Sequence, residues 1–92
     1  MAYTLVEAGM FQIIRSPLQL GTAIRNARKG RGWTQHDLSA LSGLRQELIS
    51  RIETGHEGTK LSSIHALFAV LDLDLVVEER NARNTQGTED IF

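Results

Sequence analysis

The 92-residue chain contains no cysteine, which excludes disulfide scaffolds, zinc sites built on thiolates and thiol nucleophiles. No apolar run approaches the roughly 18 residues that would span a bilayer, and the start MAYTLVEAGM has no basic segment followed by an apolar stretch. We therefore expect neither membrane insertion nor secretion, and we expect a cytoplasmic protein. Because so short a chain forms only one small core and has no disulfide to stabilise it, oligomerisation is favoured.

The sequence also lacks the side-chain patterns of a metal site or an enzyme. His36, His56 and His65 lie in three separate segments without the i, i+4 spacing of a zinc site. No pattern indicates an activated nucleophile or a catalytic carboxylate pair, and Gly30-Arg31-Gly32 does not match a phosphate-binding loop. We therefore expect no metal, no cofactor and no enzymatic activity.

The net charge of −1 is small, but the charges are unevenly distributed. Residues 15–60 carry eight basic and four acidic side chains, a net charge of +4, whereas residues 61–92 carry two basic and six acidic side chains, a net charge of −4. The basic middle favours a polyanionic partner. The acidic end is either a solubility device or a docking surface for a basic partner.

Helix signals begin at Ser16-Pro17. The serine can cap a helix, proline suits the first helical position because its missing N–H costs nothing there, and Gln19 is placed to close a capping box. The glycines at 30 and 32 end this first helix. Its buried stripe recurs at three- and four-residue spacing and consists of Leu20, Ala23, Ile24 and Ala27.

A second, short helix is predicted after Trp33. Thr34 can cap it, Asp37 stands three residues later as the acid of a capping box, and Trp33 can pack on the helix as a hydrophobic staple. Gly43 ends the helix, because glycine allows the left-handed backbone that a tight turn between helices requires. Its predicted apolar side consists of Leu38 and Leu41.

Two further helices give an all-α domain of four or five helices. One runs from about residue 45 to residue 53, and its inward-facing residues are Leu44, Leu48, Ile49 and Ile52. A loop at residues 56–60 leads to the other, whose apolar residues match the i, i+3, i+4, i+7 pattern of a buried face. These residues are Ile64, Leu67, Phe68 and Leu71.

Short β-strands are predicted on either side of the helices. Residues 10–15 (MFQIIR) form a β-rich run, and after the fourth helix Leu73, Leu75 and Val77 alternate with Asp74 and Glu78. Two such strands make a marginal sheet alone, but exchanged with a second copy they give a covered sheet with fewer open edges. We therefore divide the chain into an N-terminal extension (1–9), a helical domain with flanking strands (10–80) and a disordered tail (81–92).

The two central helices carry the functional signal. A short capped helix, a glycine turn and an amphipathic helix with a polar outer face describe a helix-turn-helix, whose second helix enters the DNA major groove. There an amide can pair with adenine and a guanidinium with guanine. Gln46, Arg45 and Arg51 are therefore the candidate residues for base contacts.

These residues resemble the Cro/cI-type helix-turn-helix family of phage repressors and bacterial regulators over about residues 20–75. The resemblance rests on Trp33-Thr34-Gln35 followed by Leu38, Leu41, Gly43, Leu44, Ile49, Ile52 and Glu53. It implies a lambda-repressor-like fold in which Gln35 contacts a phosphate and Arg28 pairs with Glu53 beside the DNA backbone. The DNA-binding residues that it implies are Arg28, Thr34, Gln35, Arg45, Gln46, Glu47, Ser50 and Arg51. Trp33, Gly43 and Glu53 would be structural.

Glu47 departs from this pattern, because an acid repels phosphate and suits only the amino group of cytosine. It either contacts a base or orients a neighbouring arginine. The pair of Arg28 and Glu53 is likewise open to two interpretations, a structural bridge or an exposed ion pair of little energetic value.

The flanks narrow the resemblance to HipB-type antitoxins over about residues 11–80. It rests on Phe11-Gln12, Ser16-Pro17, Gln19-Leu20, Gly32-Trp33-Thr34-Gln35 and the apolar segment after the fourth helix. The resemblance implies a homodimer with terminal strands paired between subunits, a palindromic operator upstream of its own gene, a HipA-type serine/threonine kinase toxin as partner, and a place at the nucleoid of the bacterial cytoplasm. Two alternatives stay open: a stand-alone or phage-like regulator without a toxin, and a module that uses its helix-turn-helix to dock protein.

Overall fold

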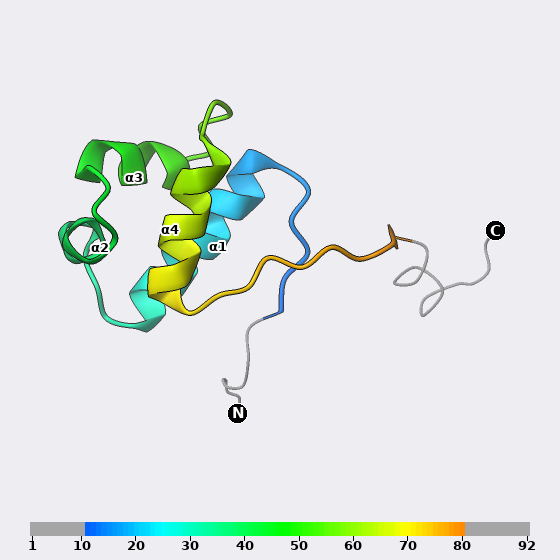
Figure 1. Cartoon of the computed structure of the whole chain (residues 1–92), viewed down its shortest axis with the longest axis horizontal. Coiled ribbons are helices and arrows are strands. Elements are labelled where there is room, and N and C mark those ends of the chain that lie inside the picture. The colour runs from blue at the N-terminus through cyan, green and yellow to red at the C-terminus, as the bar shows by residue number, and fades with distance from the viewer. Residues whose placement is uncertain (1–10, 81–92) are drawn as a thin grey trace.

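A computed structural model describes residues 11–80, which contain four α-helices (Figure 1). They are α1 (Pro17–Gly30), α2 (Gln35–Ser42), α3 (Gln46–Glu53) and α4 (Leu61–Leu71). The predicted all-α class is confirmed, and each predicted helix is present. Helices α2 and α3 lie at one end of the molecule, away from the extended segments that flank the helices. The predicted N-terminal extension and C-terminal tail lie outside the described residues.

The start of α1 follows the sequence signals closely but not completely. The Ser16 hydroxyl accepts a hydrogen bond from the Gln19 backbone N–H at 3.1 Å, and Pro17 takes the first helical position. The Gln19 side chain, however, accepts from the backbone N–H of Arg15. The predicted capping box is therefore wrong in its second half, because the glutamine carbonyl reaches one residue beyond the cap.

All four helices contribute to one apolar core. Its fully or nearly fully buried members are Ile24, Leu38, Ile49, Ile52, Ile64, Leu67, Phe68 and Leu71. Leu41 was predicted to join them, but its side chain is 55% exposed. The prediction is wrong because α2 is only about two turns long and buries a single side chain, Leu38.

A close approach between α1 and α3 fixes the position of the helix-turn-helix. Gly21 is buried on α1, and a Cβ atom there would lie 2.3 Å from the carbonyl oxygen of Ile52 and 2.8 Å from that of Glu53. Only glycine lets the backbones meet at this distance, because any Cβ would overlap the carbonyl groups. The C-terminal end of α3 therefore rests directly on α1.

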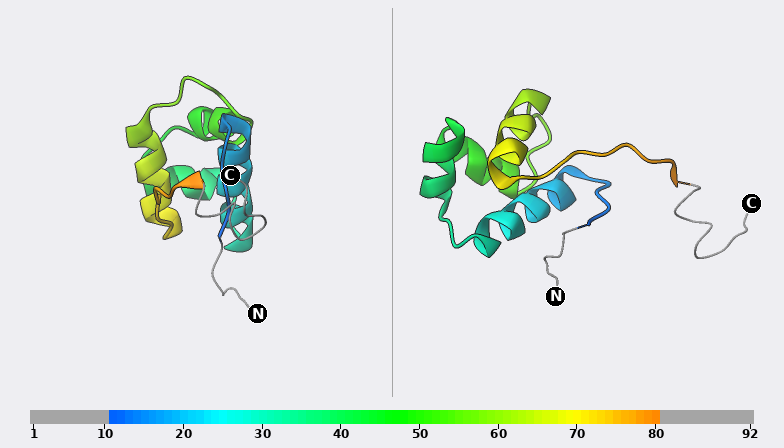
Figure 2. Two further views of the ribbon diagram at one scale, coloured as in Figure 1. Left: turned by 90° about the vertical axis from the view of Figure 1, so that its right-hand side faces the viewer. Right: turned by 60° about the horizontal axis from the view of Figure 1, so that its bottom comes forward.

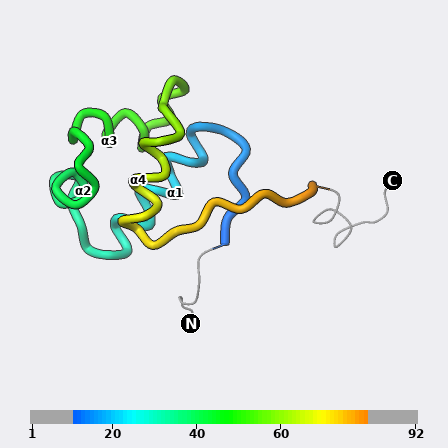
Figure 3. Tube along the Cα trace, in the orientation of Figure 1, coloured from blue at the N-terminus to red at the C-terminus, as the bar shows by residue number. Residues whose placement is uncertain are grey.

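The two predicted strands are not formed in the described part of the single chain. Residues 11–15 and 73–79 have an extended or irregular backbone without strand pairing, and residues 73–80 leave the end of α4 and run away from the helices (Figures 2 and 3). The physical reason is that a strand needs a neighbour for its backbone hydrogen bonds. Pairing across a dimer stays a prediction. No helix within residues 11–80 is long and apolar enough to cross a membrane.

Candidate nucleic-acid interface

The turn between α2 and α3 has the predicted glycine conformation. Gly43 has φ +80°, and its backbone N–H donates to the carbonyl of Ser39 at 3.0 Å. Two serine side chains complete the turn, since the Ser39 hydroxyl donates to the Leu44 carbonyl and the Ser42 hydroxyl accepts from the Leu44 N–H at 3.2 Å. These bonds satisfy the end of α2 and fix the direction in which α3 starts.

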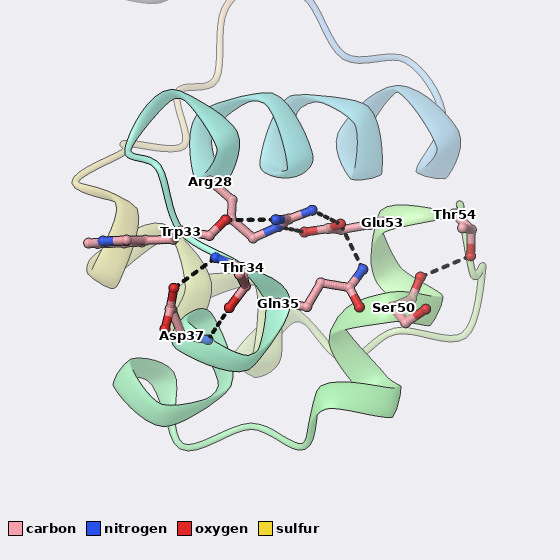
Figure 4. A network of polar contacts seen from close by, with 8 residues as sticks. All are labelled: Arg28, Trp33, Thr34, Gln35, Asp37, Ser50, Glu53 and Thr54. Atoms are coloured by element: carbon pink, nitrogen blue, oxygen red, sulfur yellow. Dashed lines mark hydrogen bonds and ion pairs between the residues drawn. The ribbon is translucent and has the colours of Figure 1, made fainter.

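The capping box at the start of α2 is confirmed (Figure 4). The Thr34 hydroxyl accepts from the Asp37 N–H at 3.0 Å, and the Asp37 carboxylate accepts from the Thr34 N–H at 2.9 Å. The hydrogen bond from the Thr34 backbone lowers the pKa of Asp37 below its usual value. The charged carboxylate therefore stabilises the start of the helix that carries Gln35.

Trp33 packs against the core from the segment between α1 and α2. Its ring is partly buried against the apolar core, and the guanidinium of Arg31 lies over it, 5.3 Å from the ring centroid. The same Arg31 donates to the carbonyl of Leu71 at 3.1 Å. The segment between α1 and α2 is thus tied to the end of α4.

Arg28 and Glu53 form a buried, two-point ion pair between α1 and α3. The Arg28 Nε lies 2.8 Å from Glu53 Oε2, its Nη2 lies 3.0 Å from Oε1, and its Nη1 donates to the carbonyl of Trp33 at 2.8 Å. The two residues are 7% and 5% exposed. The alternative of an exposed pair is therefore wrong. The attraction between the two charges is stronger in these buried surroundings than it would be in water.

Gln35 joins this pair from α2. Its side-chain Nε2 donates to Glu53 Oε1 at 3.1 Å (Figure 4). One glutamate thus holds an arginine of α1 and a glutamine of α2 while belonging to α3 itself. Of the residues predicted to bind DNA, Arg28 stands apart, because it is buried and its guanidinium is engaged in these bonds.

The outward face of α3 brings the other predicted residues together. Gln46, Glu47, Ser50 and Arg51 line an open hollow on the surface, and Gln35 of α2 completes it. Arg45 is exposed directly before α3, and Thr34 is exposed at the start of α2. On the opposite side of α3, Ile49 and Ile52 are buried in the core. Polar groups therefore line the outer side of α3 while apolar side chains anchor its inner side.

One feature of this arrangement, the glycine on α1 that meets α3, was missed at the level of sequence. Gly21 stands inside a helical pattern, and an isolated glycine there is itself a signal for close packing. Thr54 ends α3 with a hydroxyl that donates to the carbonyls of Ser50 and Arg51 at 3.0 and 3.1 Å. Within residues 11–80, no three histidine or acidic side chains gather in a way that could hold a metal ion.

The comparison with protein families agrees with this geometry, since residues 24–77 match the helix-turn-helix family model. The chain is also 32% identical over 79 residues to antitoxin HipB of Escherichia coli K12, a match covering 86% of this chain and 90% of that protein. The chain belongs to the HipB antitoxin family of helix-turn-helix proteins. HipB of Escherichia coli O6:H1 is 34% identical over 79 residues, covering 86% of this chain and 84% of the relative. This is a family of DNA-binding antitoxins and not of enzymes.

Solved structures show the same fold. A HipB–O4 20mer complex superposes with a TM-score of 0.71 at 33% identity, covering 76% of this chain and 99% of that chain. The HipB-type chain in a HipA–HipB–O2–O3 complex gives 0.70 at 33% identity, with the same coverage. The restriction-modification controller protein C.AhdI from Aeromonas hydrophila gives 0.59 at 29% identity, covering 63% and 88%.

Proposed function

We propose that this antitoxin-family chain is a sequence-specific repressor of its own operon that binds a palindromic operator as a homodimer and holds a HipA-like serine/threonine kinase. The observation that carries the proposal is the outward face of α3, where Gln46, Ser50 and Arg51 line one open hollow with Gln35. A helix anchored by apolar residues on one side and polar on the other suits the major groove.

The residues in and around the hollow divide into two roles by their chemistry. The amide of Gln46 matches the donor and acceptor of adenine, and the Ser50 hydroxyl can bond to either kind of base edge. Arg45 and Arg51 supply positive charge for phosphates or guanine, and Gln35 and Thr34 lie at the helix start where phosphate contacts are favourable. Base edges would then be read by α3, and the phosphate backbone by the start of α2.

Arg28 serves DNA binding through another residue. Its buried guanidinium holds Glu53, and Glu53 holds the Gln35 amide at 3.1 Å. A side chain whose rotamer is fixed loses less conformational freedom when it meets a phosphate. Arg28 and Glu53 are thus positioning residues for Gln35.

Dimerisation is supported by the apolar side chains on the extended flanks. Ile13, Leu75 and Val77 are 46%, 54% and 98% exposed, and a strand formed with a second copy would cover them. Two recognition helices would then face neighbouring half-sites about 34 to 36 Å apart. The kinase partner is supported by the similarity to HipB in a HipA–HipB–O2–O3 complex. A dimer that binds DNA and a kinase would be located at the nucleoid of the bacterial cytoplasm.

The decisive experiment is a gel-shift assay with the DNA upstream of the protein's own gene. We expect a specific complex whose affinity falls about 10³- to 10⁵-fold between about 50 and 200 mM salt, as about six to ten phosphate contacts require. Binding that ignores salt and sequence would contradict the proposal and favour a protein-docking module.

Co-purification separates an antitoxin from a stand-alone regulator. When the tagged chain is expressed with the neighbouring gene of its operon, we expect it to retain a kinase of several times its own mass. A chain that binds the upstream DNA but retains no such protein would be a regulator without a toxin.

A further inference from the structure

Glu47 is the one acid among the residues that line the hollow on α3. It is exposed in the first turn of the helix, next to Gln46 and one turn before Ser50 and Arg51. An acid on a surface that approaches DNA weakens binding to every sequence by repelling phosphate. Some other interaction must therefore offset this cost if the surface binds DNA, and the inference below rests on that proposed function.

No basic side chain within residues 11–80 forms an ion pair with Glu47. Arg45 and Arg51 lie two residues before it and four residues after it, but within residues 11–80 neither forms an ion pair with the Glu47 carboxylate. The arrangement thus gives no support to a glutamate that serves to orient an arginine. Glu47 lines the hollow, and its carboxylate forms no ion pair with Arg45 or Arg51.

The chemistry of a carboxylate then limits what it can meet in the major groove. It only accepts hydrogen bonds. Guanine presents two acceptors there, thymine an acceptor and a methyl group, and adenine an acceptor beside its amino group, whereas cytosine presents an amino donor alone. A carboxylate is attracted by the cytosine and repelled by the acceptors of the other bases.

We propose that Glu47 is a specificity-determining residue that selects a cytosine in each operator half-site. Gln46 reads a different base of the same half-site, since an amide can both donate and accept. Glu47 discriminates mainly by weakening the binding of other half-sites. A half-site without the cytosine leaves the carboxylate desolvated and without a hydrogen-bond donor. Replacing that cytosine should weaken binding about 5- to 150-fold.

The test uses the full chain and a library of DNA duplexes with a randomised half-site. The sequences enriched by the wild-type chain are then varied one base pair at a time, and affinities are measured at fixed salt for the wild type, Glu47→Gln and Glu47→Ala. Glu57→Gln is the matched control, because Glu57 is an exposed acid in the loop before α4 and does not line the hollow. Thermal unfolding of each variant reports separately on the contribution of Glu47 to the start of α3.

We expect the wild-type profile to contain one cytosine whose replacement costs about 5- to 150-fold. In Glu47→Ala this preference disappears at that base pair alone, and in Glu47→Gln it moves toward adenine. Glu57→Gln keeps the wild-type profile. If both Glu47 variants keep the profile and bind all duplexes more tightly by one common factor, Glu47 only repels phosphate and the inference is overturned while the proposed function stands. A wild-type chain that enriches no sequence would overturn the proposed function, and this inference with it.

Discussion

The two sides of α3 differ in solvent exposure and in the contacts that hold their side chains. The inner side consists of Ile49, Ile52 and Glu53, which are at most 5% exposed and are held by the core or by Arg28. The outer side consists of Gln46, Glu47 and Arg51, which are exposed and line a hollow. Glu53 links the inner side to the hollow through its hydrogen bond to Gln35 of α2. The comparison teaches that substitutions inside should change the free energy of unfolding, and substitutions outside should change affinity and selectivity.

The largest expected effect comes from breaking the buried ion pair. Glu53→Ala should lower the free energy of unfolding by about 3 to 5 kcal/mol, because it leaves the Arg28 guanidinium buried without its partner. A urea titration followed by circular dichroism measures the change. The double variant Arg28→Met/Glu53→Leu should be less destabilised than Glu53→Ala, since it buries no unpaired charge. If Glu53→Ala and the double variant lose the same free energy of unfolding, the unpaired buried charge of Arg28 is not the cause of the loss.

The next effect comes from the contact between α1 and α3. Gly21→Ala should cost about 1 to 3 kcal/mol of unfolding free energy, because the new Cβ overlaps the Ile52 carbonyl and must displace α3. Gly30→Ala is the matched control, since nothing lies within 4 Å of a Cβ built there. The control should be neutral or stabilising by about 0.5 to 1 kcal/mol. If Gly21→Ala and Gly30→Ala change the stability equally in a thermal melt, the close approach of α1 and α3 at Gly21 is contradicted.

On the outer side, Gln46→Ala should leave the unfolding free energy almost unchanged and weaken operator binding by about 1 to 3 kcal/mol, with relaxed selectivity at one base pair. Gln35→Ala should instead weaken binding to all sequences alike. Gel shifts with operator and unrelated duplexes separate the two patterns. Asn26→Ala, at an exposed amide on α1, should change neither. A large loss of stability in Gln46→Ala would place that side chain among the residues that hold the fold.

The smallest effect concerns the cap of α2. Thr34→Ala should lower the unfolding free energy by about 0.5 to 2 kcal/mol, because it removes the acceptor for the Asp37 N–H. The variant Thr34→Ser keeps the hydroxyl and should stay close to the wild type in the same melt.

Asp37 makes part of this cap dependent on pH. Because folding lowers the pKa of Asp37, its charge stabilises the native state above the unfolded-state value of about 4, and this contribution is lost as the pH falls through the lower native value. The stability difference between wild type and Asp37→Asn should therefore shrink below about pH 4. A difference that is constant across this range would mean that the carboxylate charge plays no part in the cap.

Much of this architecture could be predicted from the sequence because its signals are local. Caps, glycine turns and apolar spacing act within a few residues, so Thr34 with Asp37, Gly43 and the face with Phe68 were predicted correctly. Features that depend on a neighbour were not. Residue spacing does not show how much of α2 is buried, so Leu41 was wrongly predicted to be on its buried side. Spacing also cannot show that α1 contacts α3 at Gly21.

The candidate site shows the same division. Helical spacing was sufficient to predict that Gln46, Glu47 and Ser50 share an outward face, because residues three and four apart are neighbours on a helix. The spacing of Arg28 and Glu53, 25 residues apart, could not show that their pair is buried or that Gln35 joins it. The flanking strands were predicted from a β-rich run at residues 10–15 and an alternation after α4, and neither pattern shows which neighbour would accept the backbone hydrogen bonds of a strand.

The most direct test of the account maps the DNA-binding surface residue by residue. Backbone amide signals of the full chain are recorded by NMR while a duplex carrying the operator is added at low salt. We predict the largest shifts at residues 45–51 and at Gln35, with small shifts at the buried residues of α4. Shifts concentrated on α4 or on residues 73–79, with none along α3, would contradict the claim that the outer side of α3 is the surface that binds DNA.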